Sequence, residues 1–175
     1  MFDLIIANGT VVDGSGSARK RADVGVVDGC ITALGDLSHQ TALTRHDASG
    51  RIVCPGFIDV HTHDDRLLLE EVHGAHPKLT QGVTTVVTGN CGISLAPLRS
   101  TGSPPAPLDL LGTQGWIYEH FSEYLDALES ARPALNAVCL VGHGTLRVRH
   151  VADLQRAATP GEAELMARDL ARAMD

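Results

Sequence analysis

The spacing of hydrophobic residues changes near residue 55, and this change divides the chain into two predicted parts. In the first part, short apolar runs are interrupted by Asn8-Gly9 and Asp28-Gly29, dipeptides that are typical of tight turns between β-strands. No apolar repeat at three- and four-residue spacing accompanies them, so no helix is expected here. Residues 1–54 are therefore predicted to form a small unit of β-strands.

In the second part, short apolar runs alternate with stretches of helical periodicity. The expected strands are 57–60, 83–88 and 137–141, the expected helices are 66–73, 116–130 and 162–174, and the Pro- and Gly-rich residues 100–115 are an expected loop. Thr159 and Glu162 have the spacing of a capping box, with Pro160 at the first helical position. Strands that alternate with helices predict βα units and a parallel sheet.

Each expected strand of the second part ends beside a side chain that can bind a metal. His61 and His63 end the first strand, and alternate side chains of a strand face the same side, so the two imidazoles form half of a candidate metal site. Cys91 follows the second strand and His143 follows the third. In βα barrels, chemistry gathers at the carboxyl ends of the strands. For His143, a role near the site and a purely structural role both remain open.

Composition narrows the function classes. The net charge is −7 and the chain has no long basic run, which argues against nucleic acid and anionic membranes as partners. No apolar stretch approaches the ~20 residues of a membrane span, and the first residues do not resemble a signal peptide. The four cysteines are far apart, so reduced thiols and a cytoplasmic location are expected.

The other chemistry-bearing residues are expected to have ordinary structural roles. Small core positions are predicted for the three remaining cysteines, Cys30, Cys54 and Cys139. Asp64 and Asp65 could cap a helix or line the site, and capping and solvation are favoured. Arg147 could bind an anion, and an exposed salt bridge is the favoured expectation. His73 and His76 are expected to be solvated in a helix or loop.

Four segments carry a resemblance to a known family. They are NGTVVDG at 8–14, GFIDVHTHDD at 56–65, QGVTTVVTGNCGIS at 81–94 and VGHGTLR at 141–147. Together they resemble the amidohydrolase superfamily and, within it, the D-aminoacylase (N-acyl-D-amino-acid deacylase) family. The Asn-Cys-Gly sequence at 90–92 is the more specific mark, because many relatives have a carboxylated lysine as bridging ligand where this family has cysteine.

The resemblance implies an α/β fold with two parts. Residues 1–54 would form a β-sandwich portion, and residues 55–175 would form part of a TIM-like metal-dependent hydrolase barrel. About three βα units are expected, so this barrel would be incomplete, since a closed one has eight. His61 and His63 would take one metal position, and Cys91 would bind the tighter zinc. The implied reaction is zinc-dependent hydrolysis of a small N-acyl-D-amino acid, with zinc-activated water attacking the amide and a carboxylate passing the proton to the amine.

The same resemblance places two further zinc histidines, the catalytic aspartate and the closing sandwich strands after residue 175. The chain is therefore expected to be an N-terminal fragment that has no catalytic residue of its own and is inactive alone. Two alternatives remain open. One is another amidohydrolase, such as a cyclic-amide hydrolase, against which Cys91 argues. The other is a catalytically dead fragment that binds only a metal or a partner.

Overall fold

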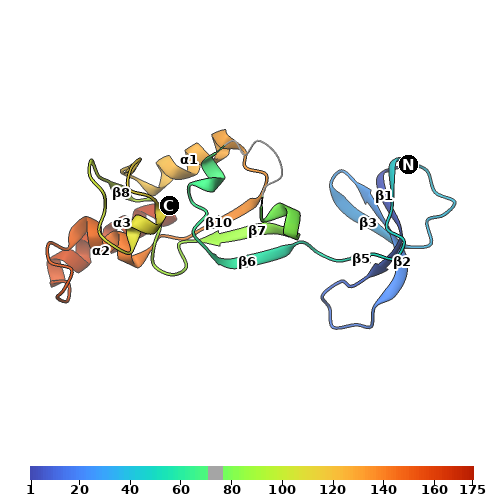
Figure 1. The fold of residues 1–175 in the computed structure, drawn as a ribbon, viewed down its shortest axis with the longest axis horizontal. Coiled ribbons are helices and arrows are strands. Elements are labelled where there is room, and N and C mark those ends of the chain that lie inside the picture. Colours follow the sequence, from blue (N-terminus) through green and yellow to red (C-terminus); the bar gives the residue numbers. More distant parts are fainter. Residues whose placement is uncertain (71–76) are drawn as a thin grey trace. The chain divides into compact units, whose positions relative to one another are not determined.

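The structure is a computed structural model of the chain, and it describes residues 1–70 and 77–175. The chain divides into two compact units, Met1–Pro55 and Gly56–Asp175, whose elements are labelled in Figure 1. The assignment of these units as a β-sandwich portion and a partial barrel stays a prediction. No helix within the described ranges is long and apolar enough to cross a membrane.

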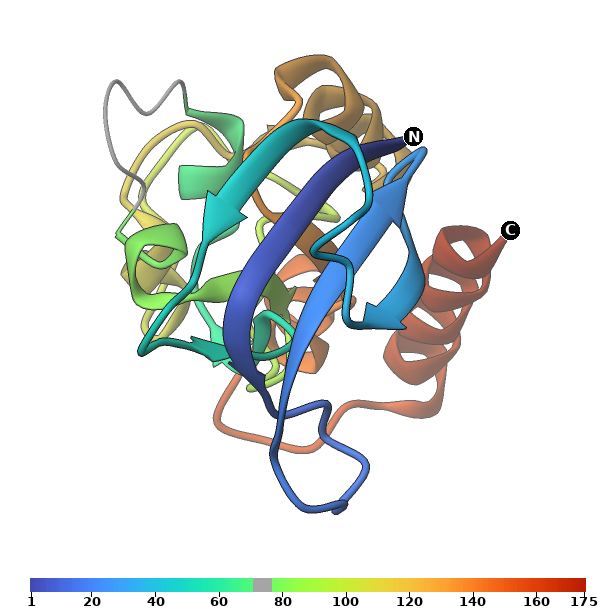
Figure 2. The ribbon, with the colours of Figure 1, turned by 90° about the vertical axis from the view of Figure 1, so that its right-hand side faces the viewer.

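Unit 1 is a five-stranded sheet with the order β3-β2-β1-β4, and β5 pairs with β1. Its strands are β1 (Phe2–Val11), β2 (Lys20–Val27), β3 (Cys30–Gly35), β4 (Ala42–Asp47) and β5 (Ile52–Val53). β1 pairs antiparallel with β2 and parallel with β4 and β5; Figure 2 shows β1, in dark blue, beside β2. The predicted turn at Asp28-Gly29 is confirmed, because both residues have positive φ angles, 50° and 73°, between β2 and β3.

The predicted turn at Asn8-Gly9 is wrong. β1 continues through both residues, and its register with β2 shifts between Ile6 and Gly9, which marks a β-bulge. Asn8 has a φ of 63°, so the same tolerance of left-handed backbone that favours asparagine in turns serves a bulge here. The Asn8 backbone N–H donates to Asp23 Oδ1 (2.8 Å) and its Nδ2 donates to Asp47 Oδ1 (2.9 Å). These bonds to both neighbouring strands keep the chain in the sheet.

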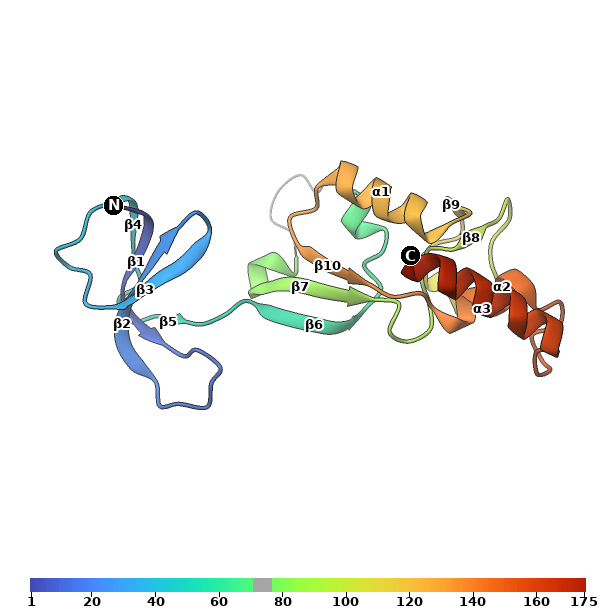
Figure 3. The same ribbon diagram turned by 180° about the vertical axis from the view of Figure 1, so that it is seen from behind.

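Unit 2 contains a three-stranded parallel sheet with the order β10-β7-β6, which confirms the predicted parallel pairing. The strands are β6 (Phe57–Thr62), β7 (Val83–Thr88) and β10 (Asn136–Cys139), and Figure 3 shows them side by side. A short antiparallel pair, β8 (Leu98–Arg99) and β9 (Ile117–Tyr118), lies outside this sheet. The main core of the unit joins Val86 of β7 to Trp116, Tyr124 and Leu128.

The described residues form three α-helices, of which the first and third correspond to expected helices and the second was not expected. They are α1 (Phe121–Ala131), α2 (His143–His150) and α3 (Pro160–Met174), and 3-10 turns occupy η1 (Leu67–Leu69), η2 (Leu79–Gln81) and η3 (Leu108–Leu111). The capping box of α3 is confirmed, since Thr159 N–H donates to Glu162 Oε2 (2.8 Å) and Glu162 N–H donates to Thr159 Oγ1 (3.3 Å). η3 lies within the expected loop 100–115.

The helix expected at 116–130 begins later, at Phe121. Trp116 instead precedes β9, is 1% exposed, and donates from Nε1 to Gly112 O (2.8 Å). The Glu123 carboxylate accepts from the backbone N–H groups of Glu119 (2.7 Å) and His120 (3.3 Å). These bonds stop the helix from extending toward Trp116, because they satisfy the N–H groups at its start.

Several expectations about individual residues need correction, and two concern residues outside the described ranges. Cys30 and Cys54 are exposed and not in the core, because one adjoins a tight turn and the other follows β5; Cys139 is half-buried and packs against the main core. Of the helix expected at 66–73, the described part forms only the 3-10 turn η1. His73 and His76 lie outside the described residues.

Candidate metal centre

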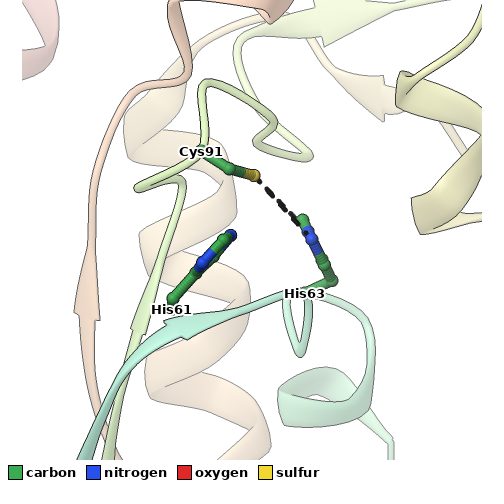
Figure 4. Close-up of side chains that lie close together, drawn as sticks. All are labelled: His61, His63 and Cys91. Carbon is green, nitrogen blue, oxygen red and sulfur yellow. Dashed lines mark hydrogen bonds between the residues drawn. The ribbon is translucent and has the colours of Figure 1, made fainter.

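His61, His63 and Cys91 come together at one edge of the parallel sheet. One ligand atom from each lies within 4.8 Å of the others, and Cys91 Sγ is 3.8 Å from both ring nitrogens of His63. The two imidazole centroids are 5.7 Å apart, with the rings inclined at 68°. Figure 4 shows the three side chains pointing toward one another. Within residues 1–70 and 77–175, this is the one group of three metal-ligating side chains so arranged.

The chemistry and spacing of these donors fit a zinc ion. Zinc prefers thiolate and imidazole ligands, and tetrahedral bonds of ~2.3 Å to sulfur and ~2.0 Å to nitrogen separate those two donors by about 3.5 Å. The observed separation of 3.8 Å between Cys91 Sγ and the His63 nitrogens lies close to that value. All three residues are exposed, so an ion can reach them without a rearrangement of the core.

Strand pairing explains why the histidines and the cysteine meet. β6 and β7 are parallel neighbours, and their last paired residues are Thr62 and Thr88. Both strands therefore end at the same edge, where His63 follows one strand and Cys91 follows the other shortly afterwards. The register shifts between Asp59 and Thr62, and such a bulge beside a site changes the direction of nearby side chains.

A tight turn presents Cys91. Gly89 and Gly92 have φ angles of 83° and 88°, values that residues with a Cβ atom rarely adopt. Gly92 N–H donates to Gly89 O at 2.9 Å and closes the turn around Asn90 and Cys91. Asn90 Nδ2 donates to Val60 O at 2.8 Å. The turn that carries the cysteine is thus tied to the strand that carries His61.

His143 lies outside the group of three. It is the exposed first residue of α2, and the backbone beside it contacts the segment after Cys91. Gly144 N–H donates to Gly92 O (2.8 Å), and Gly142 N–H donates to Ser94 Oγ (2.8 Å). The start of α2 therefore helps to fix the cysteine turn, while the role of the His143 side chain stays a prediction.

A buried pair, Ser94 and Thr145, joins the same two segments. Ser94 N–H donates to Thr145 Oγ1 (2.9 Å), and Thr145 Oγ1 donates to Ser94 O (2.8 Å). Both residues are at most 2% exposed, so neither group has water as an alternative partner. Sequence reasoning assigned no role to this pair, although both residues lie within the segments that carry the family resemblance.

The expectation that Asp65 is a cap or a solvated residue is wrong, because its exposed fraction is 0% and the turn η1 that follows it begins without a side-chain cap. Its Oδ1 accepts from Leu95 N–H (3.0 Å), and its backbone carbonyl accepts from the Tyr124 hydroxyl (2.9 Å). Oδ2 is buried without a hydrogen-bond partner in the described structure. Burial raises the pKa of the Asp65 carboxyl group. Asp65 thus connects the segment after His63 to Leu95, in the segment that follows Cys91, and to Tyr124 of α1.

Lys78 and Asp59 also adjoin the site and were missed at the level of sequence. A hydrogen bond from Lys78 Nζ, followed by one from the His61 backbone, lowers the pKa of Asp59. Burial alone would lower the pKa of Lys78, but Asp59 and Asp64 together raise it. The signal in the sequence was Asp59, the one charged residue in the otherwise apolar expected strand 57–60. Asp64, expected to be a cap or solvated, is largely buried and ion-paired to Lys78.

Arg147 does not make the exposed salt bridge that was expected. It is half-buried, and its guanidinium donates to Leu154 O (3.2 Å) and Arg156 O (2.8 Å). These bonds join α2 to the chain that follows it. The arginine therefore satisfies backbone carbonyls, and among residues 1–70 and 77–175 no carboxylate pairs with it.

A family model and two curated relatives all point to the amidohydrolase family. Residues 46–174 match the Amidohydro_3 model of the amidohydrolase family. The chain is 57% identical over 171 residues to a D-aminoacylase of Alcaligenes xylosoxydans xylosoxydans, covering 97% of this chain and 35% of the relative. It is 46% identical over 174 residues to an N-acyl-D-glutamate deacylase of the same organism, covering 99% and 35%. The chain thus spans about a third of the length of these relatives.

Solved structures agree. A structure of D-aminoacylase, described by its binuclear metal centre, superposes with a TM-score of 0.92 at 51% identity, covering 99% of this chain and 36% of that one. N-acyl-D-glutamate deacylase from Bordetella bronchiseptica, complexed with zinc and a phosphonate inhibitor, gives a TM-score of 0.87 at 44% identity, covering 98% and 36%.

The start of α2 lies so close to the cysteine turn that adding one methyl group at Gly142 should destabilise the protein. A Cβ at Gly142 would lie 2.5 Å from Gly92 O and 2.8 Å from Ser94 N. We expect Gly142→Ala to destabilise the protein by about 1–3 kcal/mol in chemical denaturation, because backbone must move. The matched control is Gly161→Ala in α3, where a Cβ meets no atom within 4 Å. Equal stability of the two variants would contradict this account.

Burial of Asp65 predicts a pH-dependent effect. Its folded-state pKa is raised, so ionisation costs stability as the pH rises above the ordinary value of about 3.9. Asn keeps the acceptor for Leu95 N–H without the charge, so Asp65→Asn should gain stability relative to the wild type as the pH rises through the raised pKa. Asp65→Ala leaves that N–H unpaired and should lose about 1–3 kcal/mol at low pH.

Denaturant titrations at several pH values, with a chelator present, measure both Asp65 effects. The difference between wild type and Asp65→Asn should level off above the folded-state pKa. A difference that is the same at every pH would show that the buried carboxylate is not the source.

Proposed function

The chain belongs to the amidohydrolase family, and on this basis we propose that it supplies metal ligands for zinc-dependent hydrolysis of the amide bond of N-acyl-D-amino acids. The convergence of His61, His63 and Cys91 on one point carries the proposal. The names of the relatives support the substrate class, since they are a D-aminoacylase and N-acyl-D-glutamate and N-acyl-D-aspartate deacylases. A small-molecule substrate follows from this proposal.

Each ligand has a defined task in the proposed centre. The resemblance assigns His61 and His63 to one metal position and Cys91 to the tighter zinc. In the 175 residues alone, the three side chains would share one ion, the histidines through neutral imidazole nitrogens and Cys91 through a thiolate. Zinc supplies a Lewis acid for the amide carbonyl and lowers the pKa of water to about 7. The exposed side of the three ligands leaves room for the substrate and for further ligands. The thiolate also offsets part of the charge of the ion.

The proposed ligands predict metal binding by the 175-residue protein. We expect His61→Ala, His63→Ala and Cys91→Ser each to weaken zinc binding by at least ~10-fold in a calorimetric titration, because each removes a donor atom. His39→Ala is the control, since His39 is an exposed histidine of unit 1. If all variants bound zinc as the wild type does, the proposed centre would be wrong.

A chimera tests the proposed reaction. When this chain replaces the matching third of the Alcaligenes D-aminoacylase, we expect zinc-dependent release of D-amino acids from N-acetyl-D-amino acids, with little release from the L-isomers. The chimera with His63→Ala should lose most of this activity. A folded, zinc-loaded chimera without deacylation would count against the proposal.

The 175 residues alone should bind zinc without turning over substrate. The resemblance assigns the proton-transferring aspartate and two further histidines to positions after residue 175, and general acid–base catalysis contributes 10²–10⁴-fold to typical rates. The assay compares the zinc-loaded and the chelator-treated protein with N-acetyl-D-amino acids. Release of free D-amino acid only from the zinc-loaded sample would refute this expectation.

A further inference from the structure

One lysine contacts the segment that carries both histidines at three points. Lys78 Nζ lies 2.5 Å from Asp59 Oδ2, 2.9 Å from Thr62 Oγ1 and 3.1 Å from Asp64 Oδ2. The contacts with Asp59 and Thr62 are hydrogen bonds and the contact with Asp64 is an ion pair, so one ammonium group holds all three oxygens. In sequence, these oxygens come before, between and after the two histidines. The contacts therefore span the whole of the His-Thr-His segment.

Asp59 extends this contact to the backbone of a ligand. Its Oδ2 binds Lys78, while its Oδ1 accepts from the His61 backbone N–H at 3.2 Å. The register of β6 is irregular between Asp59 and Thr62, so strand pairing alone does not fix the backbone at His61. The lysine and the aspartate together supply contacts that the interrupted ladder lacks.

These contacts are partly shielded from water. The side chains of Lys78 and Asp64 are 22% and 15% exposed, and that of Asp59 is 34% exposed. Thr62 is buried at 5%. Charged hydrogen bonds in such surroundings are stronger than those of fully exposed pairs, because water screens them less. Lys78 can thus hold the segment against thermal motion better than a surface lysine could.

The chain also anchors Lys78 to the strand that leads to Cys91. Lys78 precedes the turn η2, and its backbone carbonyl accepts from Val83 N–H, the first residue of β7, at 3.1 Å. Gly82, with a φ of 85°, accepts from Phe57 N–H at the start of β6 (2.8 Å). The lysine is therefore fixed to both strands whose far ends carry the ligands.

We propose that Lys78 is a positioning residue for the metal centre, holding His61 and His63 in the arrangement that binds the ion by joining Asp59, Thr62 and Asp64. This inference rests on the proposed metal-binding function. Lys78 would not touch the metal or the substrate. Its contribution is preorganisation, which lowers the cost of ordering the ligands when the ion binds.

The test compares zinc affinity, cobalt spectra and stability in the full 175-residue protein. Lys78→Met keeps much of the length of the side chain and removes its charge. We expect it to weaken zinc binding by about 10–100-fold, and to change the visible spectrum of the Co2+-loaded protein through altered coordination. Lys78→Arg should recover part of the affinity. The matched control is Lys20→Met, which removes the exposed Lys20 of β2 in unit 1.

The outcomes separate this inference from the proposed function. Absence of zinc binding by the wild type would refute the metal centre itself. Normal zinc binding and an unchanged cobalt spectrum in Lys78→Met would overturn only the role of Lys78, even if the metal-free protein were less stable. If Lys78→Met does not fold, Asp59→Asn decides the question, because it keeps the side-chain shape and removes the charge; zinc affinity equal to that of the wild type would overturn the proposal.

Discussion

The parallel pairing of β6 with β7 is the constraint on which the candidate centre depends. Parallel neighbours need a crossover connection and finish at the same edge of the sheet. Here the paired ends are Thr62 and Thr88, and the residues beyond them are free to carry ligands. His63 and Cys91, 28 positions apart in sequence, consequently lie 3.8 Å apart. An antiparallel arrangement of the same strands would place them at opposite edges.

Buried polar contacts hold the segments beyond the strand ends, while the ligands themselves stay exposed. Asp65 binds the backbone of Leu95, and Ser94 binds Thr145 in both directions. Each such bond adds little net stability. Breaking one leaves a buried polar group without a partner, and this costs more free energy than the bond contributes. They therefore specify a single path for each segment. The exposed ligands can then exchange an ion without disturbing this support.

Sequence patterns predicted what depends on local periodicity and missed what depends on distant partners. The parallel strands and the capping box of Thr159 follow from spacing alone. Asp65 was expected to be a cap or solvated, because its partner Leu95 is 30 positions away and no local pattern encodes that contact. Asn8 favours left-handed backbone in a turn and in a bulge alike, so strand pairing decided between them. Lys78 was missed because its three partners become neighbours only when β6 is formed.

X-ray absorption spectroscopy of the zinc-loaded 175-residue protein tests the central claim most directly, because it identifies the atoms bound to the ion. A centre made by His61, His63 and Cys91 predicts one sulfur neighbour at ~2.3 Å and imidazole nitrogens at ~2.0–2.1 Å. The sulfur contribution should disappear in Cys91→Ser. A wild-type spectrum with only oxygen neighbours, or one whose sulfur contribution survives in Cys91→Ser, would contradict the account.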